Sequence, residues 1–518
     1  MWEDFWLSNV RDAELVIGIV GRIGVDTRAV TSWIERELHA LHYACHPIKI
    51  TDYLLTKGFD FELKDSPIED RYTSRIDACN AIRERSNRND FFVAYAIQSM
   101  IEHRSQKTGA PDVPAARTGY IIDQIKRPEE AAALRSVYGQ QFILISCHQP
   151  IDKRQERLAR LIAEGHASAP RPDQWNSKAV ELIVRDEKES QKKFGQRVSD
   201  VFPQADLIID ASSEASAGQL LKRFFEALFG NFAISPTRDE FFQNIAHNVS
   251  LTSCDTARQV GAAIERNGDI VATGFNEAPK AFGGTYWATE GVDARDVALG
   301  SDINTVRKRQ MVAEVVQILR DSGELAEFDI DDHDIEERFI DSEGAPLKKS
   351  QIMDSLEYGR AVHAEMAALS TSARLGLSVK DGRLFCTTFP CHNCAKHIVA
   401  SGVREVFYLE PYSKSYASEL YPDSIEIDQS NADEKKVRFT QFIGITPNRF
   451  RSIFSKFKLK DSRGQIVTWS PADAQPTLEK LDQAHTSREV LFQKGLRESL
   501  DKDTAEYLGL EEQHPDDP

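Results

Sequence analysis

The chain has 518 residues, of which 41% are hydrophobic and 28% are charged, a composition typical of globular proteins. This length predicts two to four domains. The formal net charge of −17 argues against broad, sequence-independent binding to nucleic acid, because such binding depends on lysine and arginine. No apolar run is long enough to span a membrane, and the first residues lack the regions of a signal peptide, so we expect a cytoplasmic protein with no membrane contact.

The amino-terminal half alternates apolar runs with amphipathic stretches. The apolar runs are continuous, which is typical of buried parallel strands, and the stretches between them have helical periodicity. Strands are predicted at 14–21, 118–125, 141–147 and 205–211. Helices are predicted at 27–41, 128–139 and 153–165. We therefore interpret residues 1–230 as one doubly wound α/β domain.

The turn at residues 18–27, GIVGRIGVDT, follows a predicted strand and precedes a predicted helix. This is the position of a phosphate-binding loop, whose backbone amides meet an anion at the start of a helix. Aligned on Gly21, however, the pattern G-x-x-x-x-G-K-[ST] places Asp26, Thr27 and Arg28 at its second glycine, its lysine and its hydroxyl position. Without that lysine we do not expect catalysed phosphoryl transfer.

The rest of this half resembles a nucleotide kinase. Asp123 ends a predicted strand, as a magnesium-binding carboxylate would, and spaced arginines at 154, 157 and 160 resemble a lid that clamps phosphates. A plain strand end and an amphipathic helix face are the alternatives. We predict a degenerate P-loop kinase-like domain that binds a nucleotide, with or without Mg²⁺, or holds an assembly together. The candidate nucleotide-binding residues are Gly21, Gly24, Thr27 and Asp123.

A second α/β pattern begins after Pro236, which interrupts the first one. Strands are predicted at 259–268 and 269–276, as a hairpin around Asn267-Gly268, and at 382–388 and 404–410. Helices are predicted at 239–254, 361–376 and 391–402. We assign 231–470 to this domain. It contains a long polar insertion at about 284–357, interpreted as a solvated lid or a subunit contact, and 471–518 form a charged tail, helical or frayed.

The second domain holds a candidate metal site. Of seven cysteines, Cys391 and Cys394 are close enough in sequence to share a metal ion. They open a predicted helix after a strand, so both sulfurs can face one ion, and His363 at the start of another helix supplies a third ligand. Three protein ligands leave a fourth tetrahedral position for water, which indicates a catalytic zinc site. A structural site is the alternative, but it normally needs a fourth protein ligand.

This pattern resembles the zinc nucleoside and nucleotide deaminases, whose signature is H-x-E followed by P-C-x-x-C. The resemblance implies a cytidine deaminase-like α/β/α fold, with His363, Cys391 and Cys394 as zinc ligands. Glu365 would carry protons between water and the cytosine ring and amine. The zinc ion would lower the pKa of its water toward about 7.

The upstream hairpin, in CDTARQVGAAIERNGDIVATGFNEAPK, resembles the deoxycytidylate deaminases, which have an arginine before a V-G-A strand and then a G-x-N-x-x-P turn. The resemblance assigns substrate binding to Asn276, Arg258, Lys280, Ala364 and Tyr412. Asn276 would bind the sugar and base, Tyr412 would line the deoxyribose, and the two cations would bind phosphate. The alternatives are a turn former, a core aromatic and solvated charges. Glu277 departs from the usual glycine and would tighten the sugar site or weaken phosphate binding.

The pairing of the two halves resembles the bacterial antiviral cytidine deaminases. The resemblance implies hydrolytic deamination of free dCMP and dCTP during phage infection, which would deplete the dCTP pool. It also implies restraint by a small RNA antitoxin and a homo-oligomer such as a hexamer. Two other functions stay open. A polynucleotide-editing cytidine deaminase should have a basic, aromatic groove for the strand, and a nucleotide-binding regulator would use zinc structurally.

Overall fold

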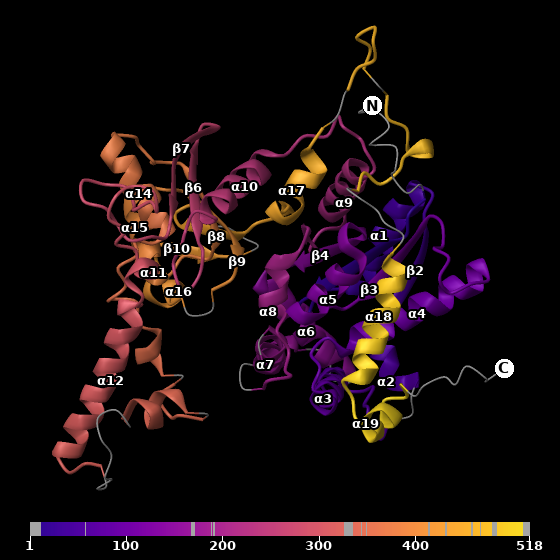
Figure 1. The fold of residues 1–518 in the computed structure, drawn as a ribbon, viewed down its shortest axis with the longest axis horizontal. Coiled ribbons are helices and arrows are strands. Elements are labelled where there is room, and N and C mark those ends of the chain that lie inside the picture. Colours follow the sequence, from indigo (N-terminus) through magenta and orange to yellow (C-terminus); the bar gives the residue numbers. More distant parts are fainter. Residues whose placement is uncertain are drawn as a thin grey trace. The chain divides into compact units, whose positions relative to one another are not determined.

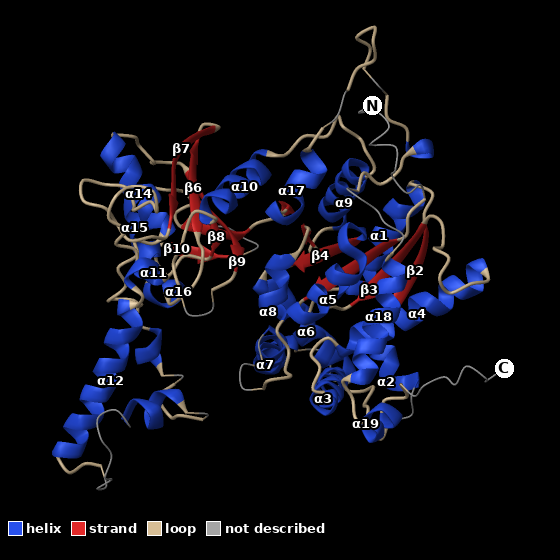
Figure 2. Ribbon diagram, viewed as in Figure 1, coloured by secondary structure: helices blue, strands red, loops and turns tan. Residues whose placement is uncertain are grey.

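A computed structural model describes residues 12–510 except 57, 58, 167–170, 188, 190, 191, 326–334, 343, 349, 413, 414, 430–432, 457, 458, 467 and 479–483. Its contacts divide the chain into two compact units, and each unit is built on one sheet (Figures 1 and 2). Unit 1 consists of Met1–Glu240, Asp428–Asn431 and Gln441–Pro518, and unit 2 of Phe241–Ile427 and Ala432–Thr440. Among the described residues, no helix combines the length and the apolar character needed to cross a membrane.

The sheet of unit 1 is parallel except at one edge. Within the described residues its order is β12-β5-β4-β1-β3-β2. The strands are β1 (Leu15–Gly21), β2 (Ala44–Lys49), β3 (Thr118–Asp123), β4 (Phe142–His148), β5 (Leu207–Asp210) and β12 (Gly444–Ile445). The four strands predicted in this half are confirmed. The strand β2 was not predicted because its sequence, ACHPIK, contains a proline, which an edge strand tolerates and a central strand does not.

Helices cover both faces of this sheet, as expected for an α/β domain. Alternate residues of β1, such as Leu15, Ile17 and Ile19, pack in one core with α1 and α9, while α5 and α8 contact β4 and β1. The helices of unit 1 are α1 (Thr27–Ala40), α2 (Tyr53–Thr56), α3 (Ile68–Ser86), α4 (Phe91–Thr108), α5 (Pro128–Tyr138), α6 (Ile151–Gly165), α7 (Asn176–Glu187), α8 (Val198–Val201), α9 (Glu214–Leu228), α17 (Pro447–Phe454), α18 (His485–Glu498) and α19 (Lys502–Tyr507).

The carboxyl-terminal segment belongs to unit 1, whereas the predicted second domain extended to residue 470. The strand β12 pairs antiparallel with β5, and the Arg449 guanidinium in α17 donates to Gln140. Farther along, Arg104 forms buried ion pairs with Glu14 and with Glu489 of α18. These charges are fully removed from water, so loss of either partner would leave a buried charge without its counter-ion. The predicted charged tail therefore includes two helices, α18 and α19, that pack on unit 1.

The sheet of unit 2 is mixed. In the described part of the chain its order is β10-β11-β9-β8-β6-β7. The strands are β6 (Gly261–Arg266), β7 (Asp269–Phe275), β8 (Arg383–Thr388), β9 (Glu405–Glu410), β10 (Ile425–Ile427) and β11 (Val437–Gln441). The predicted hairpin of β6 and β7 is confirmed, and its turn residues Asn267 and Gly268 have φ angles of 56° and 94°.

This sheet lies between two helical layers. Phe242 and Ala246 of α10 pack on one face against Ala263 and Phe385, while α14 and α15 pack on the other face. The helices of unit 2 are α10 (Arg238–Ser250), α11 (Asp296–Leu299), α12 (Ile303–Asp321), α14 (Ala364–Leu375), α15 (His392–Ser401) and α16 (Ala417–Leu420). The α/β/α layering predicted for this domain is therefore present.

The predicted insertion at about 284–357 contains α11, α12 and short turns at Glu337–Asp341 and Gln351–Asp354. It has a small core of its own, in which Val312 and Val316 of α12 pack against Ile335 and Ile340. Part of its acidic segment, residues 326–334, lies outside the described residues.

Candidate metal centre and active site

Two helix starts converge in unit 2. His363 is the N-cap residue of α14, and Cys391 is the N-cap residue of α15, which begins just after the end of β8. Cys394 lies in the first turn of α15. The amino-terminal end of a helix carries partial positive charge, which stabilises thiolates. At Cys391 the arrangement therefore favours the anionic form of cysteine that binds metal.

The three predicted metal ligands lie together. Their ligand atoms are within 4.8 Å of one another, with Nδ1 of His363 3.3 Å from Sγ of Cys391 and 3.4 Å from Sγ of Cys394. A tetrahedral zinc ion, with Zn–S bonds of about 2.3 Å and Zn–N bonds of about 2.0 Å, would hold its nitrogen and sulfur ligands about 3.5 Å apart. The donor set and spacing therefore fit zinc. Among the described residues, this group contains no fourth side chain, as a catalytic site requires.

Glu365 lies in the first turn of α14 and lines the same cavity as the metal triad. Its side chain is buried. Burial, and then the negative charge of Cys391, raise the pKa of Glu365 to about 7. Hydrogen bonding from Cys394, followed by the influence of His363, lowers the pKa of Cys391 to about 4. The Glu365 carboxyl group, which can take up or release a proton near neutral pH, thus lies close to the Cys391 thiolate, which can bind a metal ion.

The cavity beside the triad has a volume of about 350 Å³. His363, Cys391 and Glu365 line it together with residues from the turn after β7 and from the segment after β9. Other lining residues are Asp255, Thr256, Ala257, Arg258, Val260, Asn276, Asp296, Asp302, Asn304, Leu356, Gly359, Arg360, Ala361, Thr388, Phe389 and Tyr412. This volume fits a small molecule.

Asn276 lines the cavity, as predicted, but its amide also braces the surrounding backbone. Its Oδ1 accepts from Val260 N at 2.7 Å, and its Nδ2 donates to the carbonyl of Arg258 at 2.7 Å. An amide group has one further N–H and one further lone pair. Asn276 therefore holds the cavity wall in shape and retains one donor and one acceptor for a ligand.

Arg258 and Tyr412 also line the cavity. The Arg258 guanidinium lies 5.9 Å from the centre of the Tyr412 ring and 3.6 Å from a carboxylate oxygen of Glu410. Its side chain is 48% exposed. An ion pair this exposed is weak, so Arg258 can exchange Glu410 for a phosphate at little cost.

The structure does not bring Lys280 or Ala364 into the lining. Lys280 is half-exposed and pairs with Glu290 at 3.2 Å. Ala364 is fully buried between α14 and β7, where a Cβ atom on Gly274 would lie 2.3 Å from the carbonyl oxygen of Ala364. This close approach requires glycine at 274 and fixes α14, and with it His363, against the sheet.

Glu277, which stands where the related turn has glycine, has a bracing role in the structure. Its carboxylate accepts from the backbone N–H groups of Cys254 and Ala278, at 3.1 and 2.9 Å. Its backbone pairs with Val362, directly before His363. Glu277 is buried and does not line the cavity, and its contacts link the turn after β7 to the segment just before α14.

Sequence reasoning missed the contribution of the insertion to this cavity. Asp296, Asp302, Asn304 and Arg360, from the insertion and the segment after it, are among the lining residues. Arg360 donates to Asp296 at 2.5 Å, and Asp302 caps the start of α12. The N-cap pattern could have located the helix, but no sequence spacing connects it to His363. The insertion supplies a wall of the site, and its role as a lid or a subunit contact stays a prediction.

The structure also brings together the residues predicted to bind a nucleotide in unit 1. Gly21 ends β1, Gly24 has a φ angle of 95° in the following loop, and Thr27 begins α1. The Thr27 hydroxyl donates to Asp123 at the end of β3, at 3.3 Å. Gly24, Thr27 and Asp123 line a second cavity.

Comparisons with known proteins point to one family. A family model described as "Cytidine and deoxycytidylate deaminase zinc-binding region" matches residues 236–410. Deoxycytidylate deaminase of Enterobacteria phage T4 is 30% identical over 171 residues, which cover 33% of this chain and 77% of that protein. The same enzyme of Enterobacteria phage T2 is 32% identical over 175 residues, which cover 33% and 79%.

Among solved structures, the dCMP deaminase of cyanophage S-TIM5 in complex with dCMP and dUMP is 18% identical, with a TM-score of 0.23, and the match covers 40% of this chain and 99% of that one. That score is too low to support a statement about the fold. The sequence relatives and the metal triad carry the assignment, because the two phage enzymes match over most of their length. The chain belongs to the deoxycytidylate deaminase family of hydrolytic enzymes.

Proposed function

We propose that this protein catalyses the zinc-dependent hydrolytic deamination of free deoxycytidine nucleotides, dCMP or dCTP, to dUMP or dUTP. The observation that carries the proposal is one cavity that holds a three-ligand metal site and the buried carboxyl group of Glu365. The phage relatives named deoxycytidylate deaminase support the choice of a deoxycytidine nucleotide.

In this proposal His363, Cys391 and Cys394 hold the metal ion, and bound zinc lowers the pKa of a water toward about 7. Glu365 carries the protons. It takes one from the attacking water, gives one to the cytosine ring, and serves the departing amine, so that ammonia leaves and a carbonyl remains at C4. Burial of Glu365 excludes bulk water from these transfers.

The charges around the cavity favour a free nucleotide over a polynucleotide. Two arginines, Arg258 and Arg360, line it and can contact the phosphate of a single nucleotide. Four carboxylates line the same cavity, at Asp255, Asp296, Asp302 and Glu365. A single-stranded polynucleotide needs a positively charged track for its backbone. These carboxylates oppose such a track.

The substrate is tested by incubating the zinc-replete full chain with dCMP, dCTP, CMP, cytidine and a cytosine-containing oligonucleotide, and separating uracil products by chromatography. The proposal expects conversion of dCMP, dCTP or both, and none by a Glu365→Gln variant run in parallel. Conversion of the oligonucleotide alone contradicts it. Zinc binding without turnover of any cytosine compound would favour a regulator with a structural zinc site.

We further propose that unit 1 is a degenerate P-loop kinase-like domain. Its parallel sheet, with a glycine-bearing loop after β1, supports this proposal. We also propose, as the first part to test, that the deamination depletes the dCTP pool during phage infection. Plaque counts and dCTP pools in infected cells that carry the wild-type chain or Glu365→Gln test the first part. Equal plaque counts would contradict it. Restraint by a small RNA and assembly into a homo-oligomer stay predictions.

A further inference from the structure

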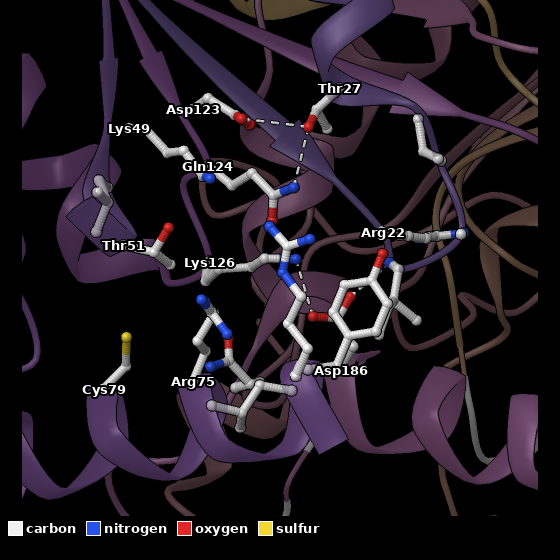
Figure 3. A pocket seen from close by; sticks show the side chains of 18 of the residues that line it. Arg22, Thr27, Lys49, Thr51, Arg75, Cys79, Asp123, Gln124, Lys126 and Asp186 are labelled. Carbon is white, nitrogen blue, oxygen red and sulfur yellow. Dashed lines mark hydrogen bonds and ion pairs between the residues drawn. The ribbon is translucent and has the colours of Figure 1, made fainter. Parts of the chain in front are cut away.

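Unit 1 contains a second cavity, of about 320 Å³, at the carboxyl ends of β1, β2 and β3 (Figure 3). The loop after β1, the residues that follow β2 and β3, and one face of α3 line it. Small-molecule sites have volumes of about 300 Å³ and upward. In open α/β sheets, ligands bind beyond the carboxyl ends of the strands. The size and the location of this cavity both fit a small-molecule site.

The lining of this cavity is strongly cationic, although the chain as a whole has a formal net charge of −17. Arginine and lysine supply eight lining side chains, against three aspartates. The cations are Arg22, Arg28, Lys49, Arg71, Arg75, Arg83, Lys126 and Arg157. Positive charge gathered in a concave site attracts anions. We therefore expect an anionic ligand.

Two of these cations, Arg71 and Lys49, are weakly engaged, whereas the Arg75 guanidinium also donates to the carbonyl of Lys64 at 2.7 Å. The Arg71 side chain forms no ion pair or hydrogen bond with any part of the chain that the structure describes. Lys49 is 3.9 Å from Asp52, and both side chains are exposed. Arg75 pairs with a carboxylate that is itself 86% exposed. Ion pairs this exposed contribute little, so a phosphate can displace them at little cost.

Part of the loop after β1, in contrast, is engaged by other residues of the chain. The backbone N–H of Ile23 donates to Asp186 at 2.7 Å. The Lys126 ammonium donates to the other oxygen of Asp186 at 2.8 Å (Figure 3). It also donates to the carbonyl of Gly21. A carboxylate thus takes the N–H and the lysine that would otherwise meet a phosphate. We therefore place the ligand's phosphate on the α3 side, where Arg71 has no ion pair within the described residues.

The remaining walls suit a nucleoside. Apolar and aromatic side chains line the cavity at Ile50, Ile68, Tyr72, Ile76 and Cys79. Asp123 adds a polar contact. Its Oδ1 is buried and has no hydrogen-bond partner among the described residues, while its Oδ2 accepts from Thr27 (Figure 3). A buried acceptor without a partner is costly. A ring amine or a sugar hydroxyl of the ligand would satisfy it.

We propose that this cavity binds a nucleoside phosphate and does not transfer its phosphate. The phosphate contacts Lys49, Arg71 and Arg75, and the base lies against the apolar face of α3. Asp123 accepts a hydrogen bond from the base or the sugar. We expect no phosphoryl transfer, because the loop after β1 has no lysine at its end and the Asp186 carboxylate accepts from the backbone N–H of Ile23 in that loop. This site goes beyond the deaminase function and does not depend on it.

Binding is tested by calorimetric titration of the full chain carrying Glu365→Gln with AMP, GMP, dTMP and ATP, which are not cytosine compounds. Adenosine and inorganic phosphate are titrated separately. We expect one site per chain for at least one nucleotide, weaker binding at higher salt, and much weaker binding of adenosine and of phosphate alone. Binding of phosphate as tight as that of every nucleotide would overturn the assignment of a base site.

A matched pair of charge reversals locates the site. Arg71→Glu removes a proposed phosphate contact, and we expect it to weaken nucleotide binding about ten- to hundredfold, as for the loss of a charged hydrogen bond. Arg85→Glu makes the same charge change on an exposed residue of the same helix, α3, outside the lining, and we expect no change in nucleotide binding. Lys49→Gln is a milder second variant if Arg71→Glu does not fold. Equal losses of nucleotide binding in Arg71→Glu and Arg85→Glu would overturn the location.

Two controls separate this proposal from the deaminase function. In the chain with intact Glu365, Arg71→Glu should leave dCMP deamination and zinc content unchanged. ATP with each monophosphate should give no phosphoryl transfer by chromatography, and transfer that Arg71→Glu abolishes would overturn the binding-only assignment. Absence of nucleotide binding alongside normal dCMP deamination would reject this site while leaving the deaminase function in place.

Discussion

The two cavities of this protein have similar volumes, about 350 Å³ in unit 2 and 320 Å³ in unit 1, but opposite charge. Four carboxylates and two arginines line the first, and three aspartates and eight cations line the second. A cavity that moves protons next to a metal ion needs a buried acid, whereas a cavity that holds an anion needs donors. The difference in charge indicates a reactive site in unit 2 and agrees with the binding site that we propose in unit 1.

The largest expected effect is on the metal-dependent cavity. Cys394→Ala removes one of three ligands, so we expect zinc content and dCMP deamination to fall together, by at least the 10²–10⁴-fold that is typical for the loss of a proton-transfer group. Mass spectrometry of bound zinc and initial rates measure both. Cys254→Ala, at an exposed cysteine outside the triad, is the control and should retain zinc and activity. A Cys394→Ala protein with full zinc and full turnover would remove Cys394 from the site.

The next effect separates the proton carrier from the metal. Glu365→Gln preserves the shape of the side chain but cannot take a proton, so we expect kcat to fall about 10²–10⁴-fold while zinc content stays unchanged. Glu277→Gln changes a buried glutamate that braces the neighbouring turn without lining the cavity. We expect it to retain most of the activity. Equal losses in the two variants would mean that Glu365 acts through the structure alone.

A smaller effect concerns the pH dependence of unit 1. His148, at the end of β4, is buried, and burial lowers its pKa from 6.5 to about 4, against the attraction of Asp428. Between these values the unfolded chain binds more protons than the folded chain. The stability that His148 contributes is therefore fully present above pH 6.5 and is lost as the pH falls toward 4, by up to about 1.4 kcal/mol per pH unit.

Urea denaturation of the full chain at pH 7, 6, 5 and 4.5 measures this dependence. His148→Gln has no group that titrates in this range, so its unfolding midpoint should decrease less with pH than that of the wild type. Identical pH profiles for the two proteins would show that His148 is not the group responsible.

The smallest effect tests which cation contacts the substrate phosphate. Because Arg258 is half-exposed, we expect Arg258→Ala to raise KM for dCMP by roughly two- to fivefold and to leave KM for deoxycytidine unchanged. Lys280→Ala is the matched control, since Lys280 pairs with Glu290 outside the lining. A larger effect on dCMP from Lys280→Ala than from Arg258→Ala would restore the sequence-based assignment of Lys280.

The reactive site was the more predictable of the two. The residues His363, Glu365, Cys391 and Cys394 lie in two short motifs, and each motif starts a helix, so sequence spacing alone places them well. The hairpin before Asn276 was equally readable, because its Asn-Gly turn is local. These features depend on residues that are close together in the sequence, so short motifs are enough to predict them.

The other features depend on contacts between distant segments. Asp296 and Asn304 line the cavity only because the insertion folds back toward the segment that holds Arg360 and His363, and no sequence spacing encodes that return. Asp186 accepts a hydrogen bond from the backbone N–H of Ile23, in the loop after β1, although the two residues are 163 positions apart in the sequence. The strand β12 pairs with β5 in the sheet of unit 1, although most of unit 2 separates the two strands in the sequence. Such long-range contacts leave no periodic trace in the residues that make them.

The most direct test of the central claim is the ratio of kcat/KM for dCMP to that for the same cytosine within a single-stranded oligonucleotide, measured with the zinc-replete full chain. The account predicts a ratio well above one, because two arginines that line the cavity, Arg258 and Arg360, can contact one phosphate, and the described lining residues form no cationic track for a strand. A ratio below one, with loss of both activities in Glu365→Gln, would show that the same metal centre acts on polynucleotide and would contradict the account.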